Sequence, residues 1–346
     1  MRFAWFVVAS SLTASIAAEA AQPPAKKYEV ITPKDNDIIA TGMNARGEII
    51  GFEWVESKQQ PGVIDQVPFI AKGKEITYLP LLKGYTATFP NAVSDDGVVV
   101  GRASKPAPPG VRLYLRNQAF IWDARQGIRG LGVLKDDWAS FATGITRDGK
   151  RISGFSVGDN RMRACIWNLD GENWVGTPLP HEHQLGSNVV AISDNGKFIT
   201  AVDGSFPCLW SQAPSGEWAR EPIGGSGALT PRAVNNDGTV VGLRDGGNGT
   251  MNALVWTRKG GILNIERPKD YPRAEALAIN NLGAVVGMID GAHGSKVLPK
   301  GFVYEDGKLR FLDEGGPNFV SATGINDKGQ VTGVFEKEEE EKGHAH

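Results

Sequence analysis

ATGINDKGQVTG, residues Ala322–Gly333, is the last of seven copies of one short pattern in this chain. Each copy has an apolar stretch that ends in Asn, Ser or Thr, a turn closed by glycine, and a second apolar stretch that ends in Gly or Ala. The turn glycines lie 42 to 52 residues apart. A repeat of this period is the sequence signature of a solenoid or a β-propeller. The copies are Ala40–Gly51, Asn91–Gly101, Ala142–Gly154, Val190–Ala201, Arg232–Gly242, Leu277–Gly287 and Ala322–Gly333.

Each copy is predicted to form a β-hairpin. In the last copy the first strand stops at Asn326, whose side chain can bond its own backbone, and Gly329 can adopt the left-handed conformation that closes the turn. The second strands are apolar on both faces, as expected for strands that are covered on both sides. The third and fourth copies carry one extra residue, which in the third lies between Gly149 and Gly154, and we interpret it as a β-bulge.

A second pattern follows six of the hairpins and supplies two more strands per repeat. It is a small residue, two apolar residues and an aromatic residue, followed by a polar turn and another short strand; the copies begin at Pro68, Ala119, Ala164, Pro207, Ala253 and Gly301. No stretch has a helical period. Four short antiparallel strands per repeat predict an all-β protein, a β-propeller that forms a single domain over residues 28–335.

Seven hairpins predict seven blades, and a six-bladed ring with one extra hairpin is the alternative. The stretch Tyr28–Ile31 precedes the first hairpin, where the closing strand of a preceding repeat would lie. We therefore expect the two ends of the propeller to meet in one shared or incomplete blade.

The two patterns together resemble the HAF repeat of bacterial extracellular proteins, a family named for a His-Ala-Phe triplet. Gln118-Ala119-Phe120 is the nearest match to that triplet, and Asn252 stands in the place of the His in another copy. The resemblance covers nearly all of Tyr28 to Val334. It implies a repeated β structure in an exported protein, and it implies no catalytic residue, because the repeats of this family are structural.

The ends of the chain predict export. A basic start, an apolar run and a small-residue site indicate a signal peptide over residues 1–20, cleaved after Ala20, with a linker at 21–27. The alternative, a membrane anchor, is disfavoured because the apolar run is shorter than the roughly 20 residues a span needs. We expect a secreted or periplasmic protein without a membrane span after cleavage, ending in a disordered acidic tail at 336–346.

Composition argues against nucleic acid, a metal and a cofactor. The 37 Lys and Arg residues balance 39 Asp and Glu residues, which leaves no basic surface for nucleic acid. The Asx-rich turns are too short for calcium, and His344 and His346 lack a third ligand. Cys165 and Cys208 occupy equivalent slots of neighbouring repeats, too far apart for a disulfide, so we expect two buried thiols.

Function is expected in the irregular loops between the copies, which should open on one face of the ring. The leading prediction is a non-catalytic binding or interaction module that holds a glycan or protein ligand on this loop-rich face. The candidates for binding are aromatic, basic and histidine side chains, which suit an acidic or sugar-like ligand: Arg112, Tyr114, Arg116, Trp138 and His293.

An alternative is a carbohydrate-active enzyme, such as a lyase that acts on uronic-acid polymers. A lyase needs a cation to neutralise the uronate and a base and an acid within reach of the substrate. The candidates are a His-x-His loop, two arginines and two tyrosines: His181, His183, Arg161, Arg163, Tyr85 and Tyr271. A structural surface protein is the third possibility.

Overall fold

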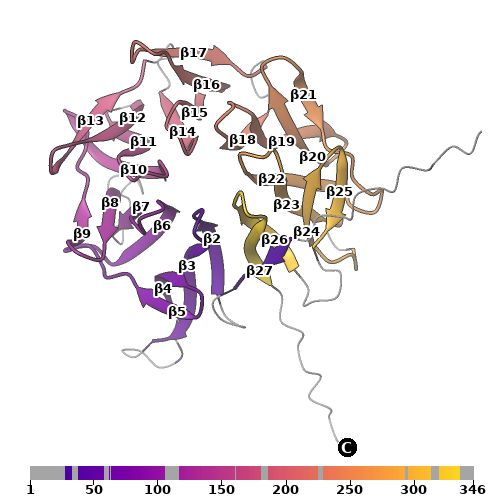
Figure 1. Cartoon of the computed structure of the whole chain (residues 1–346), viewed down its shortest axis with the longest axis horizontal. Coiled ribbons are helices and arrows are strands. Elements are labelled where there is room, and N and C mark those ends of the chain that lie inside the picture. The colour runs from indigo at the N-terminus through magenta and orange to yellow at the C-terminus, as the bar shows by residue number, and fades with distance from the viewer. Residues whose placement is uncertain are drawn as a thin grey trace, which may run out of the picture.

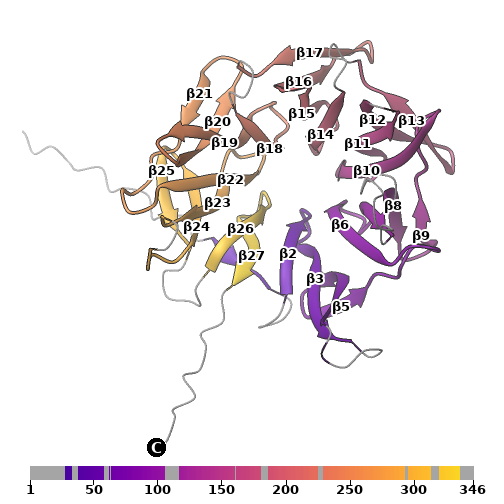
Figure 2. The same cartoon turned by 180° about the vertical axis from the view of Figure 1, so that it is seen from behind.

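The structure is a computed structural model, and all of its regular elements are β-strands. It describes residues 28–32, 38–57, 62, 64–105, 117–159, 161–180, 186–224, 229–292, 295–312 and 319–335. The strands are grouped around a common centre in both views of the ring (Figure 1; Figure 2). The prediction of an all-β propeller is confirmed. The signal peptide, the linker and the acidic tail lie outside the described residues.

Four sheets each contain four consecutive strands in antiparallel order, with the first strand nearest the ring centre. These sheets are the first four blades. Their strands are β2 (Ile38–Met43), β3 (Glu48–Glu56), β4 (Ile64–Lys72) and β5 (Glu75–Tyr78); β6 (Ala87–Val93), β7 (Val99–Ser104), β8 (Asn117–Asp123) and β9 (Gly127–Gly130); β10 (Asp137–Ile145), β11 (Arg151–Gly158), β12 (Arg161–Asp170) and β13 (Asn173–Pro178); β14 (Ser187–Ile192), β15 (Phe198–Asp203), β16 (Phe206–Gln212) and β17 (Trp218–Pro222).

A fifth sheet has eight strands, but it divides into two halves of the same kind. One parallel pair, Met251 with Arg273, joins the halves, and within each half the strands are antiparallel neighbours. The first half contains β18 (Thr230–Val234), β19 (Val240–Gly247), β20 (Thr250–Thr257) and β21 (Gly261–Asn264). The second half contains β22 (Arg273–Ile279), β23 (Val285–Asp290), β24 (Lys300–Glu305) and β25 (Lys308–Phe311).

The last sheet joins the two ends of the ring. β26 (Phe319–Ile325) and β27 (Gln330–Phe335) form the final hairpin, and β1 (Glu29–Val30) pairs with β27. The expected meeting of the ends is confirmed. However, β1 is the third strand and runs parallel to β27, whereas a closing strand of a regular blade would be the fourth and antiparallel.

The final hairpin also packs on the first blade. The Thr323 hydroxyl donates a hydrogen bond to the Ala40 carbonyl oxygen at 2.7 Å, so the hairpin belongs to the ring rather than lying beside it. With the eight-stranded sheet divided at its single parallel pair, the described strands form seven groups. This arrangement favours seven blades over six, and the blade number stays a prediction.

Six of the seven hairpins end in a glycine that lies in close contact with the backbone of the first strand. Every hairpin of the described residues has an irregularity in its first strand, as between Pro90 and Ala92. There the strand bulges toward its partner, and a Cβ at Gly101 would lie 2.0 Å from the Phe89 carbonyl oxygen. Equivalent glycines in five other hairpins have a carbonyl oxygen as near. The fourth hairpin carries Ala201 at this position.

Because all seven hairpins have this bulge, it cannot explain the extra residue that only the third and fourth repeats carry. The interpretation of that residue as a β-bulge is wrong. The extra residue lies in the turn. In the regular turn of the last repeat the Asn326 amide donates to the Gln330 carbonyl, whereas in the third repeat the Thr146 amide donates to the Arg151 carbonyl, one residue further along. The inserted residues directly follow the turn glycines: they are Lys150 and Lys197.

The core lies between the blades. The residue that follows the small residue of the second pattern is fully buried in every copy: Phe69, Phe120, Cys165, Cys208, Leu254 and Phe302 are each 0 % exposed. Both cysteines are free, which confirms the prediction of two buried thiols. Burial raises the pKa of the Cys165 thiol, and it raises that of Cys208 to about 12.

Candidate functional site

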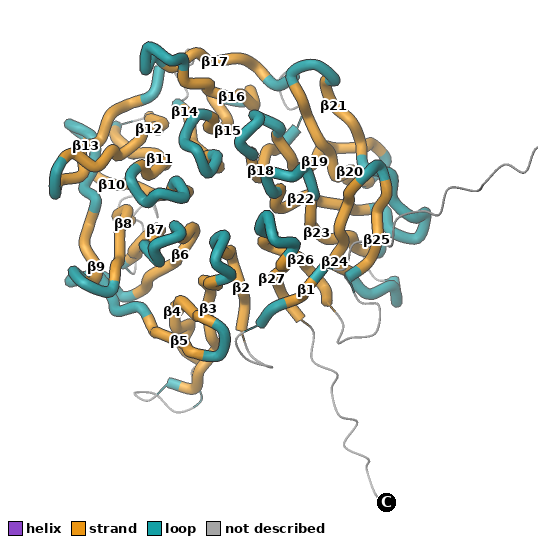
Figure 3. The backbone as a smooth tube through the Cα atoms, viewed as in Figure 1, coloured by secondary structure: helices purple, strands orange, loops and turns teal. Residues whose placement is uncertain are grey.

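The antiparallel order gives the ring two distinct faces. The turn face carries the hairpin turns and the turns between the third and fourth strands of each blade. The loop face carries the remaining connections: the β10 residue Asp137 pairs with Gly158 at the end of β11, and Gly158 pairs with Arg161 at the start of β12. The loops that leave the second strand and those that enter the next blade therefore open on one face, as expected. Figure 3 shows the hairpin turns gathered around the ring centre.

Hydrogen bonds between neighbouring turns link one blade to the next. The Asn326 side chain accepts hydrogen bonds from the Lys328 and Gln330 amides of its own turn at 3.1 Å each. Its Nδ2 donates to the Asn44 carbonyl oxygen of the first blade at 3.3 Å, and Asn44 in turn donates to the Ser94 carbonyl oxygen at 2.8 Å. The asparagine thus shapes its own turn and also holds the adjacent one.

In the turn of the third repeat the next residue is Arg147, which contacts three carboxylates from three other repeats. We call Arg147, Asp95, Asp194 and Asp327 the central cluster. Arg147 Nη2 lies 3.1 Å from Asp194 Oδ2 and 3.1 Å from Asp327 Oδ2, and its Nε lies 3.4 Å from Asp95 Oδ2. Burial lowers the pKa of Arg147, but the three carboxylates outweigh burial and raise it. This guanidinium is therefore fully neutralised within the protein.

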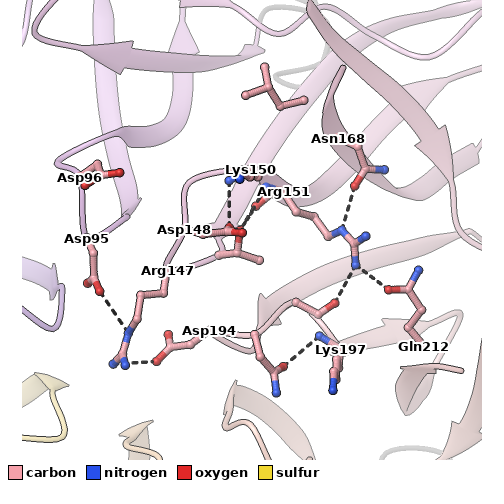
Figure 4. Close-up of a pocket in the computed structure, with 14 residues that line it drawn as sticks. Asp95, Asp96, Arg147, Asp148, Lys150, Arg151, Asn168, Asp194, Lys197 and Gln212 are labelled. Carbon is pink, nitrogen blue, oxygen red and sulfur yellow. Dashed lines mark hydrogen bonds and ion pairs between the residues drawn. The ribbon is translucent and has the colours of Figure 1, made fainter. Parts of the chain in front are cut away.

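A pocket of about 770 Å³ lies beside the central cluster (Figure 4). It is formed by the turns of the β6–β9, β10–β13 and β14–β17 blades. Four acidic, four basic and several amide side chains surround it. The lining residues are Asp95, Asp96, Thr146, Arg147, Asp148, Lys150, Arg151, Asn168, Leu169, Asp194, Asn195, Gly196, Lys197 and Gln212.

Arg151 is the basic group of this pocket whose described partners are neutral. Its Nε donates to Asn168 Oδ1 at 2.8 Å, and its Nη1 donates to Gln212 Oε1 at 2.7 Å and to the Gly196 carbonyl oxygen at 2.9 Å (Figure 4). Burial lowers the pKa of Arg151, although Asp148 opposes this effect. Among the described residues its Nη2 has no hydrogen-bond partner. The guanidinium is thus held by neutral acceptors and lies over the Trp218 ring at 5.8 Å, and Asp148 acts on it electrostatically without forming an ion pair.

Lys150 and Lys197, the two inserted residues, add positive charge at the same place. Both side chains are exposed, and neither ammonium group makes a hydrogen bond or an ion pair with a residue that the structure describes. The only two turns with an insertion are thus neighbours, and each contributes a lysine to the pocket.

Asp148 is the pocket carboxylate whose pKa is shifted. Burial raises the pKa of Asp148, but hydrogen bonds from the Thr146 hydroxyl and the Lys150 amide, together with the positive charges of Lys150 and Arg151, lower it by more, so that the net shift is downward. Asp96 pairs with the exposed Arg46 of the first blade at 3.0 Å. These oxygens can accept hydrogen bonds from a ligand, and Arg151 and the two lysines can donate them.

A second hollow of about 580 Å³ adjoins the pocket on the same face. It shares Asp96 and Leu169 with the pocket and runs along the outer strands of the β6–β9 and β10–β13 blades. Trp174 and Arg129 also line it, and Arg129 is paired with Asp123 at 2.8 Å. Leu169 is 40 % exposed. The two hollows therefore adjoin each other on the turn face at Asp96 and Leu169.

On the loop face, three of the predicted site residues lie in one blade. Trp138 is on β10, and Arg161 and Arg163 are on β12 of the same sheet. Arg163 Nη2 lies 2.8 Å from Asp137 Oδ2, whose side chain is fully buried, and it also donates to the Lys135 carbonyl oxygen at 2.6 Å. Arg163 is thus neutralised internally, whereas Arg161 is exposed.

The two predicted tyrosines are not brought together. Tyr85 precedes β6 in the second blade, where its hydroxyl donates to Gln118 Oε1 at 2.7 Å. Tyr271 precedes β22 in the eight-stranded sheet and packs against Phe311, with ring centroids 5.8 Å apart. The remaining candidates, His181, His183, His293, Arg112, Tyr114 and Arg116, lie outside the described residues.

Within the ranges that the structure describes, no three His, Cys, Asp or Glu side chains converge as metal ligands would. In the same ranges there is no helix with the length and hydrophobicity to cross a membrane.

Comparison with known proteins shows the fold alone. No protein-family model and no curated protein matches the chain. A solved prolyl endopeptidase matches with a TM-score of 0.52 at 12% identity, over 80% of this chain and 42% of that chain. TolB from Acinetobacter baumannii matches with a TM-score of 0.45 at 12% identity, over 72% and 57%. The β-propeller domain of the Trilobed protease from Pyrococcus furiosus matches with a TM-score of 0.40 at 11% identity, over 81% and 97%.

The chain spans 57% and 42% of the TolB and prolyl endopeptidase chains, respectively. Fold and comparisons together define a β-propeller protein, and they leave its activity to be argued from the site.

Proposed function

We propose that this chain is a non-catalytic binding module, a secreted or periplasmic β-propeller of the HAF-repeat type, and that it holds its ligand on the turn face. The pocket around Arg151 carries the proposal. It combines a guanidinium held by neutral acceptors, two lysines that form no ion pair with a described residue, and several hydrogen-bond acceptors, which is the composition of a site that binds a polar ligand.

The departure from the repeat supports this site over the loop face. A turn that only connects two strands gains nothing from a longer loop, and five of the seven turns have no insertion. Two adjacent turns each carry an additional lysine, and both lysines line the same pocket. The ring supplies the rigid scaffold, and the inserted residues supply the recognition.

The described residues give less support to a polysaccharide lyase. The cation that would neutralise a uronate on the loop face is Arg163 or Arg161, and Arg163 is already paired with Asp137. Of the two tyrosines offered as alternative acids, Tyr85 donates a hydrogen bond from its hydroxyl to Gln118 and Tyr271 packs against Phe311. The binding module therefore remains the better-supported function.

Calorimetric titration of the purified protein with soluble acidic and neutral polysaccharides tests the proposal. Three double variants locate the binding face: Lys150→Glu with Lys197→Glu in the pocket, Lys74→Glu with Lys259→Glu as a charge-matched control at exposed turns, and Trp138→Ala with Arg161→Ala on the loop face. We expect binding to be lost only in the pocket variant.

Loss in the loop-face variant alone would transfer the site to the loop face. Release of unsaturated sugar products during the same incubation would replace the binding module with a lyase. Absence of binding to every polysaccharide would favour the structural surface protein.

A further inference from the structure

We propose that the ligand of the turn-face pocket is an acidic sugar, a residue that carries one carboxylate flanked by hydroxyl groups, within an oligosaccharide. This inference rests on the proposed binding function and specifies the chemistry that the pocket recognises.

The anionic group of the ligand is assigned to Arg151. Arg147 has three carboxylate partners, whereas Arg151 has amide and carbonyl hydrogen-bond partners and an Nη2 without a described acceptor. Asp148 acts on Arg151 electrostatically but forms no ion pair with it. Lys150 and Lys197 flank it. A carboxylate bound by a guanidinium forms short, charge-assisted hydrogen bonds, and a bound anion would balance this half of the pocket.

The carboxylates of the pocket limit the charge of the ligand. Asp95, Asp96, Asp148 and Asp194 line the same space and offset its four basic side chains. The pocket therefore lacks the large positive charge that a ligand with many adjacent charges, such as a nucleic acid, a polyphosphate or an acidic peptide, would require. A sugar acid carries a single charge and several hydroxyl groups, and each hydroxyl can donate to a carboxylate or an amide oxygen. The mixture of acceptors and cations thus fits one anion among hydroxyls.

The adjoining hollow supplies a path for further sugar residues. It begins at Asp96 and Leu169, which it shares with the pocket, and continues to Trp174. Apolar and aromatic side chains pack against the C–H faces of sugar rings, while the polar groups at their edges bind the hydroxyls. The two adjoining hollows accordingly suit a short chain that places its acidic residue at Arg151.

Calorimetric titration with a galacturonate trisaccharide, its methyl ester and the neutral galactose trisaccharide tests the ligand class. We expect the acid to bind at least about tenfold more tightly than its ester, because the ester cannot form the charge-assisted contact with Arg151. Raising the salt concentration should weaken binding of the acid and leave that of the neutral sugar unchanged. Titration with a sulfated galactose oligomer tests whether the pocket prefers a carboxylate to a sulfate.

Variants of the pocket and a control variant test whether the preference for the acid over its ester arises at the pocket. Lys150→Gln with Lys197→Gln should reduce the preference for the acid severalfold, and Lys74→Gln with Lys259→Gln should not change it. Arg151→Gln should abolish the preference. Because Arg151 also joins two blades, the melting temperature of the Arg151→Gln variant is measured in parallel. If that variant unfolds, the lysine variants, which break no described hydrogen bond or ion pair, decide the test.

Equal affinity for acid, ester and neutral sugar, lost in the pocket variants, would overturn the acidic-sugar assignment and leave the binding function intact. Tighter binding of the sulfated oligomer than of the galacturonate would overturn the carboxylate assignment. Failure of all three trisaccharides together with failure of every polysaccharide would overturn both proposals.

Discussion

Arg147 and Asp327 are 180 residues apart in the sequence, yet Arg147 Nη2 and Asp327 Oδ2 lie 3.1 Å apart near the centre of the ring. The same guanidinium contacts Asp95 and Asp194, so one side chain connects the third repeat to the second, the fourth and the seventh. Asn281 of the sixth repeat also donates to Asp194 Oδ2, at 2.8 Å. Without Arg147, three carboxylates would face one another without a counter-ion.

Arg147→Met should therefore destabilise the protein. We expect the free energy of unfolding to fall by about 1–2 kcal/mol, between the values typical of exposed and of buried ion pairs. Denaturant unfolding at low and high salt measures the loss, which should be smaller at high salt because salt screens the repulsion among the carboxylates. Arg46→Met removes an exposed pair with Asp96 and should change stability by less than about 0.5 kcal/mol. Equal losses in the two variants would contradict the central role of Arg147.

Asp327 should contribute to the acid sensitivity of the fold. Burial raises the pKa of Asp327, but hydrogen bonds from the Asn281 amide and side chain and from Arg147 lower it by more. The net result is a pKa below the ordinary value of 3.8. A carboxyl with a lowered folded pKa stabilises the protein above its unfolded pKa, and this contribution is lost as the pH falls through the folded pKa. Thermal unfolding should thus show a nearly constant contribution from Asp327 near neutrality and a decline below about pH 4.

Asp327→Asn is the matched variant, since it keeps the shape of the side chain. It should be less stable than the wild-type protein at neutral pH, and the difference should narrow in acid. A difference in melting temperature that stays the same from neutral to strongly acidic pH would rule out this linkage.

The repeat made much of the fold predictable. Turn residues such as Asn326 and Gly329 follow local rules, and a period near 45 residues leaves few architectures. Even the meeting of the chain ends could be inferred, because Tyr28–Ile31 had no other place in the pattern. The parallel direction of β1 could not, because no local residue pattern sets the direction in which a strand runs beside β27.

The pocket is not predicted from the sequence, because the extra residue of the third and fourth repeats is interpreted there as a β-bulge. The extra residue in the third and fourth repeats was visible as a longer interval between two small residues, and a bulge and a longer turn produce the same interval. Only backbone hydrogen bonds, such as that from the Thr146 amide to the Arg151 carbonyl, separate the two. The signal that could have found the site was the identity of the insertion, a lysine directly after the turn glycine in two adjacent repeats.

The close approach at the repeat glycines predicts a steric effect. Gly101→Ala should destabilise the protein by about 1–3 kcal/mol, because the new methyl group would collide with the Phe89 carbonyl oxygen and the Phe120 ring. Ala201→Gly, in the hairpin that naturally carries alanine, should cost only about 0.5–1 kcal/mol through chain entropy. Chemical denaturation of both variants measures these changes. If Gly101→Ala unfolded at the wild-type denaturant concentration, the steric account of the repeat glycine would be wrong.

The two cysteines should be unreactive until the ring opens. The thiolate is the reactive form, and burial is the main reason why the pKa of Cys208 rises to about 12, with Asp203 adding to the effect and Arg220 opposing it. Cys165 is raised by burial as well. A thiol reagent at neutral pH should therefore modify neither residue in the folded protein and both in denaturant. Because both side chains are 0 % exposed, labelling should proceed at the rate of opening and become independent of reagent concentration when the reagent is in excess. Rapid modification of one thiol in the native protein would show that its blade separates from its neighbour without unfolding of the rest.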